Sequence, residues 1–322
     1  MVVPAGDRQK LDVAEQVRSV DPCGFFDQAR ISTYGQISTL GPSMSSIGSC
    51  EVGFLQADEG RRYYLSHVIV DMDSYPPNDD DPSKQIAGET VTIDGVRSSD
   101  GDCAYKVPLR FPVSAAESSQ NPDIIEVPTL SYASVRAALI TPAALGCELV
   151  ENTVTNMVTM FRENRIPRRE ALVDVPLPQR SPCELMQHLP SKYTVDKFDA
   201  ETQPYDCKFF LKSGSEIFGN DLVSVGFRLH DADRAMATFG SFESAQIAGK
   251  PVLIDRNTAV GEPQCAIRFP AGAVVDGYRP GTPATESTKS AARSQPMVAL
   301  RAQCRVTDDL APIAMELFGA NK

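Results

Sequence analysis

Alternating apolar and polar residues predict two strands that resemble each other. The positions expected on one face are Tyr63, Leu65, His67 and Ile69 in the first strand, and Val223, Val225, Phe227 and Leu229 in the second. Both runs end in Asp-x-Asp, and an alignment on that ending places His67 where the second strand has Phe227. We therefore expect His67 on an apolar face, where a histidine is more often a hydrogen-bonded core residue than a ligand.

Helical periodicity appears at the end of each half of the chain. The apolar positions are Leu149, Val154, Met157, Val158 and Phe161 in the first half, and Val306, Leu310, Ile313, Ala314, Leu317 and Phe318 in the second. Each set predicts one buried face of a C-terminal helix. Short helices are also expected after Asp21-Pro22 and Ser181-Pro182, because a capping side chain followed by proline favours a first helical turn.

Two strings of residues occur twice. Gln85–Asp94 returns as Gln246–Asp255, and Cys103–Pro108 returns as Cys265–Pro270 with the skeleton Cys-Ala, one apolar or aromatic residue, a base, an apolar residue and Pro. The shared residue types are those that determine a fold. The sequence therefore predicts a duplicated module, and not a duplicated active site.

These patterns give the expected domain organisation. We expect a lead-in segment over residues 1–20, a first repeat domain over 21–164, a linker over 165–180 and a second repeat domain over 181–322. The fold class is predicted to be α+β, with two homologous, disulfide-bonded domains. Each is expected to be an antiparallel sheet with an N-terminal and a C-terminal helix, and a ligand would lie in a cleft between them.

The chain contains eight cysteines and no C-x-x-C pair, so zinc-ribbon and thioredoxin-like sites are excluded. An even number at repeated spacing favours two disulfides in each half and an oxidising compartment, against the alternative of buried free thiols. Four cysteines allow three pairings, of which we favour first with second and third with fourth. The expected pairs are Cys23–Cys50, Cys103–Cys147, Cys183–Cys207 and Cys265–Cys304.

Composition restricts the partners. The chain of 322 residues has a net charge of −11 and no basic stripe, so we expect no nucleic-acid partner. It has neither a run of apolar residues long enough for a membrane span nor a visible signal peptide. The protein is then either cytosolic or begins after a removed signal, lipobox or anchor helix, and the cysteines favour the second alternative.

Catalytic motifs are absent from the sequence: it has no nucleophile elbow, Walker loop, dinucleotide fingerprint or zincin motif. The three histidines are His67, His188 and His230, which leaves few general bases. The acidic run from Pro76 to Pro82 lacks the spaced ligands of an EF-hand loop and is expected to be a solvated loop. We therefore expect no catalytic, cofactor or metal site, with a His67-centred or carboxylate-centred hydrolase as the alternative.

Short motifs give a resemblance to a known group of proteins. The start Asp21-Pro22-Cys23-Gly24-Phe25-Phe26, the segment Ser49–Val52, and Gly146–Leu149 leading into Ile166–Arg169 resemble cysteine-containing extracytoplasmic domains of actinobacteria. These are lipoproteins of unknown function that open with Asp-Pro-Cys and, more distantly, sensor domains of receptor kinases. The resemblance implies export, disulfides and a binding or sensing role, and it assigns no catalytic residue.

The sequence thus predicts a non-enzymatic binding, sensing or scaffold protein of the cell envelope. Its partner would be an unidentified protein or small molecule, and it would meet the membrane only through a removed anchor or lipid. A purely structural envelope protein is the third possibility.

Overall fold

The structure is a computed structural model of the 322-residue chain. The residues it describes are 5–42, 46–55, 65–74, 76–94, 103–111, 131–138, 143–169, 177–199, 204–212, 221–238, 240–257, 263–276 and 293–319. The architecture is α+β, with two antiparallel sheets and a few helices.

The first sheet has seven strands. They are β1 (Gln36–Pro42), β2 (Ser49–Leu55), β3 (Leu65–Ser74), β4 (Ser83–Ile86), β5 (Glu89–Ile93), β6 (Ala104–Pro108) and β7 (Tyr132–Ala138). Their order is β1-β2-β3-β7-β6-β5-β4. Before the sheet lie two short helices, η1 (Pro22–Phe25) and α2 (Gln28–Ile31), and after it comes α3 (Ala143–Arg162).

The second sheet has eight strands. They are β8 (Val195–Asp199), β9 (Asp206–Leu211), β10 (Asp221–Asp231), β11 (Glu243–Ile247), β12 (Lys250–Asn257), β13 (Gln264–Pro270), β14 (Val275–Asp276) and β15 (Arg293–Gln303). Read from β8, the order is β8-β9-β10-β15-β13-β12-β11, and the short β14 pairs with β15. The short helices η3 (Leu177–Gln179) and η4 (Pro182–His188) precede this sheet, and α5 (Cys304–Phe318) follows it. Without β14, the strand order repeats that of the first sheet.

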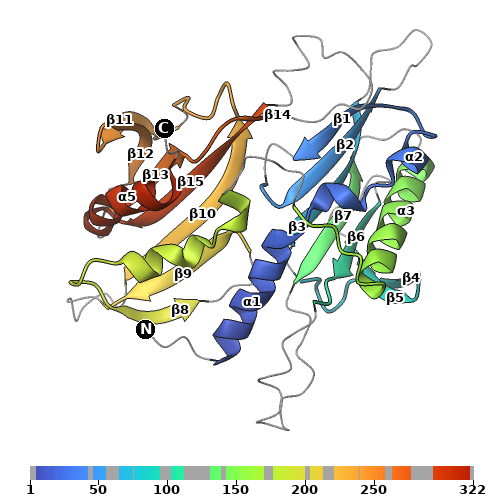
Figure 1. Ribbon diagram of the computed structural model, residues 1–322, viewed down its shortest axis with the longest axis horizontal. Coiled ribbons are helices and arrows are strands. Elements are labelled where there is room, and N and C mark those ends of the chain that lie inside the picture. The colour runs from blue at the N-terminus through green and yellow to red at the C-terminus, as the bar shows by residue number, and fades with distance from the viewer. Residues whose placement is uncertain are drawn as a thin grey trace.

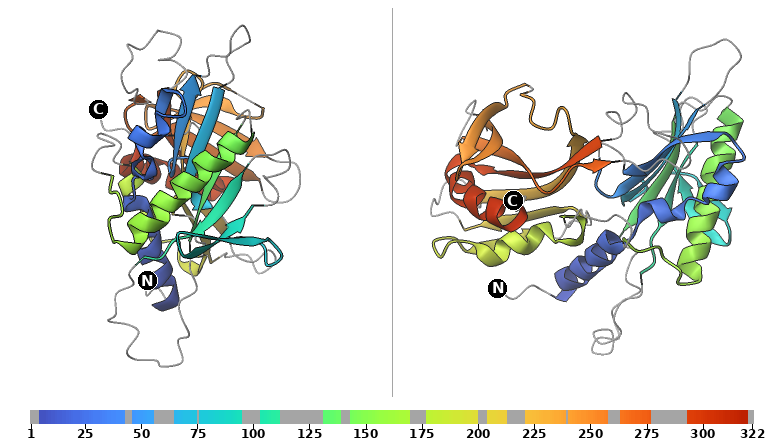
Figure 2. Two further views of the ribbon diagram at one scale, coloured as in Figure 1. Left: turned by 90° about the vertical axis from the view of Figure 1, so that its right-hand side faces the viewer. Right: turned by 45° about the horizontal axis from the view of Figure 1, so that its top comes forward.

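The two sheets stand side by side, each with its long C-terminal helix on the flank away from the other (Figure 1). Helix α3 contacts β6 and β7, and α5 contacts β13 and β15. Figure 2 shows α3 lying across the strands of the first sheet. Each helix closes its own apolar core, with Val150 and Val154 fully buried in the first and Val306 and Leu310 in the second. Within the described residues, no helix is both long and apolar enough to span a membrane.

The lead-in segment is more ordered than the sequence analysis expected. Residues Ala5–Ser19 form helix α1, in which Val13 and Val17 belong to the first core. Leu11, on the same helix, is half-buried against the second core. The helix was not predicted because its apolar residues are sparse and it needs two partners to bury them.

Four disulfides join the pairs that we favoured among the three possible pairings: Cys23–Cys50, Cys103–Cys147, Cys183–Cys207 and Cys265–Cys304. In each half, one links the N-terminal short helix to the second strand and the other links the sheet to the C-terminal helix. Disulfides persist in oxidising compartments, so four of them indicate an extracytoplasmic environment.

The starts of the two halves are capped as predicted. The Asp21 carboxylate accepts a hydrogen bond from the Cys23 backbone N–H at 2.9 Å. The Ser181 hydroxyl accepts one from the Cys183 N–H at 3.3 Å. Each cap begins a short 3-10 helix that places the first cysteine of its half against the sheet.

The repeated Ala-Gly pairs occupy equivalent tight turns. Ala87 and Gly88, between β4 and β5, have φ angles of 51° and 84°. Ala248 and Gly249, between β11 and β12, have φ angles of 49° and 75°. Two consecutive positive φ angles define the hairpin turn that matches strand twist, and glycine adopts the second without a Cβ penalty.

The expected position of His67 was wrong. Val68 and Val70 are buried in the first core, so His67 lies on the opposite face of β3. Its side chain is 18% exposed, and Nδ1 is 2.9 Å from Glu51 Oε1. Tyr63 and the side chain of Leu65 lie outside the described residues.

Strand register explains the error. The opposed pairs are Cys50 with Val70 in the first sheet and Cys207 with Val225 in the second. With the cysteines as reference points, His67 corresponds to Leu222 and not to Phe227. The Asp-x-Asp endings are therefore not equivalent, because the second strand continues further before it reaches its acidic pair. The four core positions predicted for the second strand are at most 3% exposed.

The junction between the two halves is filled by side chains. Gly48 lies so close to Tyr205 that a Cβ on the glycine would come within 2.4 Å of the ring. Arg169 donates to the Ile47 carbonyl and to the Tyr205 hydroxyl, both at 2.9 Å. Arg18 donates to the Pro204 carbonyl at 3.0 Å. Both arginines are at most 6% exposed, so this junction is packed and is not the cleft that we expected.

Candidate functional site

A hollow of about 190 Å³ lies where the β4–β5 hairpin meets the end of α3. We call it the hairpin pocket. Its lining residues are Ala87, Gly88, Glu89, Val107, Pro108, Arg110, Val158, Phe161 and Arg162. The repeated string found in the sequence thus contributes its turn to one wall of a pocket.

Aromatic packing holds the floor of the hairpin pocket. Phe161 stacks on Phe25, with ring centroids 5.8 Å apart. It also meets Phe111 edge-on at 5.4 Å. Phe161 itself is only half-buried, whereas Phe25 is fully buried. Pairs of this kind fix ring orientation, so the floor is a preformed apolar surface.

Two arginines stand at the rim. Arg162 donates from Nη1 to the Ala87 carbonyl at 2.9 Å, which ties α3 to the hairpin turn. Arg110 pairs with Glu89 at 3.0 Å, and the arginine side chain is 67% exposed. Because a guanidinium carries five N–H donors, a carbonyl partner leaves Arg162 with further donors for an anion. The pocket therefore combines an apolar floor with cationic donors.

The second half has larger side chains at two positions equivalent to the pocket lining. Counted from the preceding cysteine, Val107 corresponds to Phe269 and Val158 to Met315. Phe269 and Met315 are 1% and 3% exposed, so the larger residues are buried there. Val107 and Val158 are 1% and 6% exposed, so the two halves differ at these positions in side-chain size and not in burial.

The rim differs as well. By the same count, Arg110 and Arg162 correspond to Gly272 and Gly319. Phe318, the counterpart of Phe161, is only 4% exposed. Arg180 lies over the Phe318 ring with its guanidinium carbon 5.1 Å from the centroid. The second half thus covers the aromatic ring that the first half leaves open.

A second hollow, of about 150 Å³, lies between α2 and α3. Tyr34 donates to Glu148 Oε1 at 2.7 Å and accepts from Asn152 Nδ2 at 2.8 Å. Asn156 donates to the Phe25 carbonyl at 2.7 Å. These polar groups satisfy one another and hold the N-terminal turn to α3, so this hollow is better explained as a structural contact.

The second half repeats the contact that Tyr34 makes with α3. The Tyr193 hydroxyl donates to Asp309 Oδ2 at 2.5 Å, and Lys192 Nζ is 2.6 Å from the same oxygen. Burial first, and then the hydrogen bond to Asp309, raise the pKa of Tyr193 to about 12. Asp309 stands at the same distance from Cys304 as Asn152 does from Cys147. Sequence analysis missed this shared polar contact because the helix residue changes from an amide that donates, Asn152, to a carboxylate that accepts, Asp309.

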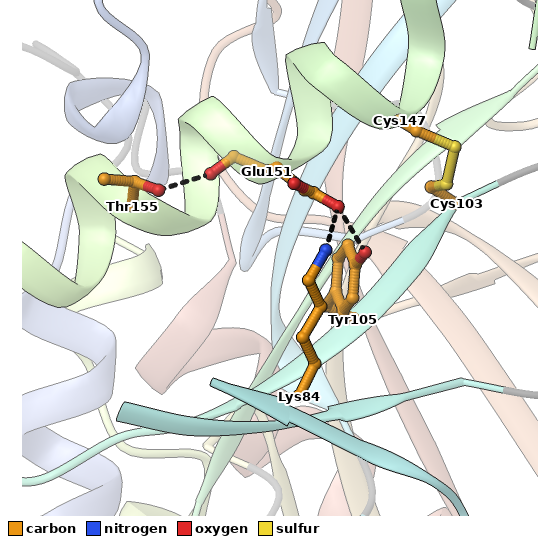
Figure 3. Close-up of polar contacts among 6 residues, drawn as sticks. All are labelled: Lys84, Cys103, Tyr105, Cys147, Glu151 and Thr155. Atoms are coloured by element: carbon orange, nitrogen blue, oxygen red, sulfur yellow. Dashed lines mark hydrogen bonds and ion pairs between the residues drawn. A yellow bond between two sulfur atoms is a disulfide. The ribbon is translucent and has the colours of Figure 1, made fainter. Parts of the chain in front are cut away.

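Lys84, Tyr105 and Glu151 form a polar cluster on α3 beside the Cys103–Cys147 disulfide (Figure 3). Glu151 Oε1 is 2.5 Å from Lys84 Nζ and accepts from the Tyr105 hydroxyl at 2.9 Å. The hydrogen bond from Lys84 lowers the pKa of Glu151, while burial raises that of Tyr105. Each group is already paired, so the cluster ties β4 and β6 to the helix.

The remaining sequence candidates do not converge on a pocket. Among the described residues, Glu51 is the group paired with His67, and no nucleophile joins them. The eight cysteines are all in disulfides. In the described part of the chain, no three His, Cys, Asp or Glu residues gather in a way that would hold a metal ion. In the acidic loop, Asp81 accepts hydrogen bonds from Asn78, which closes a local turn.

We compared the chain with models of protein families, with curated proteins and with solved structures, and found no significant match in any of the three. The resemblance to actinobacterial extracytoplasmic domains therefore stays a prediction from short motifs.

Proposed function

We propose that the chain is a non-enzymatic binding protein of the cell envelope, built from two copies of one module, of which the first binds a small ligand in the hairpin pocket. The observation that carries the proposal is the difference in volume between equivalent positions. Where the second half has Phe269 and Met315, the first has Val107 and Val158, and a pocket opens between the helix end and the hairpin.

Duplication is supported by the shared plan of the two halves. The strand order, the disulfide pairing and the positive-φ hairpin turns are equivalent. A duplication frees one copy to vary while the other keeps the fold, and several of the side chains that vary line the hairpin pocket. That arrangement favours ligand binding over a purely structural role.

The chemistry of the pocket selects the class of ligand. Val107, Val158 and Phe161 offer an apolar floor, and Arg162 offers guanidinium donors at its edge. A molecule with a short apolar body and one carboxylate matches both features. A volume of about 190 Å³ restricts it to a small molecule or a side-chain-sized group.

An extracytoplasmic location is part of the proposal, because four disulfides favour an oxidising compartment. Attachment to the envelope, as in the lipoproteins that the sequence resembles, would place the module where it meets exported or external small molecules.

A thermal-shift and calorimetric titration with hexanoate and benzoate tests the proposal. Wild-type protein should bind, whereas a V107F/V158M variant, which carries the second half's residues, should lose binding and keep its fold. Filling an existing hollow costs little stability, unlike overpacking a dense core, which typically costs about 1–3 kcal/mol.

Met315→Val, the mirror substitution in the second half, is the matched control and should leave binding unchanged. Equal binding by the wild-type protein and the V107F/V158M variant would refute the proposed pocket. A hydrolase screen gives the rival function its test: activity lost in His67→Ala would replace the binding role by an enzyme centred on the His67–Glu51 pair.

A further inference from the structure

The second sheet carries a concentration of positive charge on the face opposite α5. We call it the basic face. Its basic residues are Lys208 on β9, Arg228 and His230 on β10, Arg268 on β13, and Arg301 on β15. In a chain with a net charge of −11, such a cluster is unexpected.

Strand alternation places these side chains on one face. Phe227 and Leu229 are buried in the second core, so Arg228 and His230 point away from it. Ile267 and Phe269 are also buried in this core, so Arg268 between them points away from it. The buried Leu300 and Ala302 place Arg301 on the same outer face. The basic side chains are half-buried, except that of Arg301, which is exposed.

Two small residues form part of the floor between them, and the buried Met297 lies opposite Arg228. In the sheet register, Gly226 lies opposite Ala299, and Ala299 lies opposite Arg268. A Cβ on Gly226 would come within 2.4 Å of Asp206 Oδ1, so glycine is needed where Asp206 crosses to Arg228. Adjacent strands are about 4.8 Å apart, so the arginines of β10 and β13 are separated by roughly 10 Å over a low floor.

Carboxylates balance only part of this charge. Asp206 holds Arg228 through two hydrogen bonds, at 2.7 and 2.6 Å. Arg268 lies over the Phe242 ring, with its guanidinium carbon 4.2 Å from the centroid. Asp255 on β12 lies on the same face and acts on Arg268 through its charge. Arg268 makes no hydrogen bond or ion pair with a described residue, so the ring positions the guanidinium and leaves its donors open.

The equivalent face of the first sheet keeps the acids that the second has lost. Register and cysteine spacing match Asp71 with Gly226 and Glu51 with Lys208. They also match Lys106 with Arg268, so a base is present in both copies. Two acidic positions have therefore become glycine and lysine, while Ser49 has become Asp206, which pairs with Arg228. The exchange makes the face more positive but leaves carboxylates on it.

The positive charges of the basic face affect the protonation of His230. Burial, followed by the charges of Arg268 and Arg228, lowers the pKa of its imidazole. An anion placed between the two arginines would offset their charge. It would therefore stabilise the imidazolium and raise the pKa of His230.

We propose that the basic face binds a compact oxyanion with linked charged groups, best matched by two joined phosphates. Arginine forks suit phosphate oxygens, and a separation of roughly 10 Å between arginine columns suits two groups better than one. The net charge of −11 repels long polyanions, whereas a compact anion experiences mainly the local field. The site is independent of the hairpin pocket and gives the protein a second ligand class.

Titration with pyrophosphate, inorganic phosphate and citrate, followed by NMR of the His230 imidazole protons, tests this inference. His230→Gln assigns the resonance. Pyrophosphate should bind most tightly and raise the pKa of His230, and its affinity should increase as the pH falls and decrease with added salt. Arg268→Gln should weaken it about tenfold.

Lys106→Gln, the counterpart substitution in the first sheet, is the control and should leave affinity unchanged. The proposal is overturned if pyrophosphate leaves His230 unshifted, or if Arg268→Gln and Lys106→Gln weaken binding equally. Neither Arg268 nor Lys106 lines the hairpin pocket, so both variants should still bind hexanoate. Hexanoate binding without pyrophosphate binding would overturn this inference and leave the proposed function standing.

Discussion

At the scale of single residues, the polar groups that both halves share serve the fold. Tyr34 and Tyr193 each join the N-terminal segment of their half to the C-terminal helix. Their hydroxyls are satisfied by helix side chains, so they brace the helix against the sheet. Residues that differ, by contrast, surround both the hairpin pocket and the basic face.

Tyr193→Phe should lower the free energy of unfolding by about 1 kcal/mol at neutral pH, because it removes a hydrogen bond to a carboxylate near the surface. Folding raises the pKa of Tyr193 from 10.0 to about 12. The stabilisation is thus fully present below pH 10 and is lost as pH rises towards 12.

Urea denaturation of the wild type and Tyr193→Phe at neutral and alkaline pH checks this. The difference in stability between the two proteins should shrink as the pH rises from about 10 to about 12. A difference that stays constant over that range would show that the hydroxyl is not coupled to Asp309.

At the scale of elements, the cysteines made much of the fold predictable. Their spacing predicted two disulfides in each half, and the capped starts and helical periodicity predicted the helices that the disulfides join to the sheets. Helix α1 could not be predicted, because its few apolar residues gain their burial only from packing in the first core and from contacts with η3.

The register of β3 also escaped prediction. Alternation fixes which residues share a face but not which face is buried, and the Asp-x-Asp endings suggested a false alignment. Predicting the hairpin pocket would have required an alignment of the two halves on their cysteines. That alignment places Val107 opposite the larger Phe269. The size difference between equivalent core positions was the available signal.

Removing the disulfide between a sheet and its C-terminal helix gives a prediction at this scale. Replacing Cys265 and Cys304 by serine should lower the free energy of unfolding by about 3–4 kcal/mol, because the closed loop, with a sequence separation of 39, then regains entropy in the unfolded chain. Cys103 and Cys147, with a separation of 44, should give a similar loss. Urea denaturation of both double variants measures these losses. A loss of unfolding free energy below about 1 kcal/mol in either variant would contradict the prediction.

At the scale of the whole molecule, the two halves are joined by a buried polar junction. Arg169 and Arg18 reach across it to Tyr205 and Pro204, and both side chains are buried. Burial lowers the pKa of Arg18, whose charge is held by a backbone carbonyl. Such a junction couples the halves as long as its hydrogen bonds remain.

Arg169→Ala should therefore uncouple the unfolding of the two halves. The substitution leaves the Ile47 carbonyl without the Arg169 donor, and we expect a loss of about 2–3 kcal/mol. Scanning calorimetry should show a single transition in the wild type and two in the variant. Arg168→Ala, a matched change at an exposed neighbour, should keep one transition. A single unshifted transition in both variants would contradict this coupling.

The central claim is that the first half, and not the second, has an open ligand pocket. NMR of methyl-labelled protein titrated with hexanoate tests it most directly. The account predicts saturable shifts that are largest at Val107 and Val158, with none at Met315, and their loss in V107F/V158M. Shifts that fall elsewhere, or that persist unchanged in V107F/V158M, would contradict it.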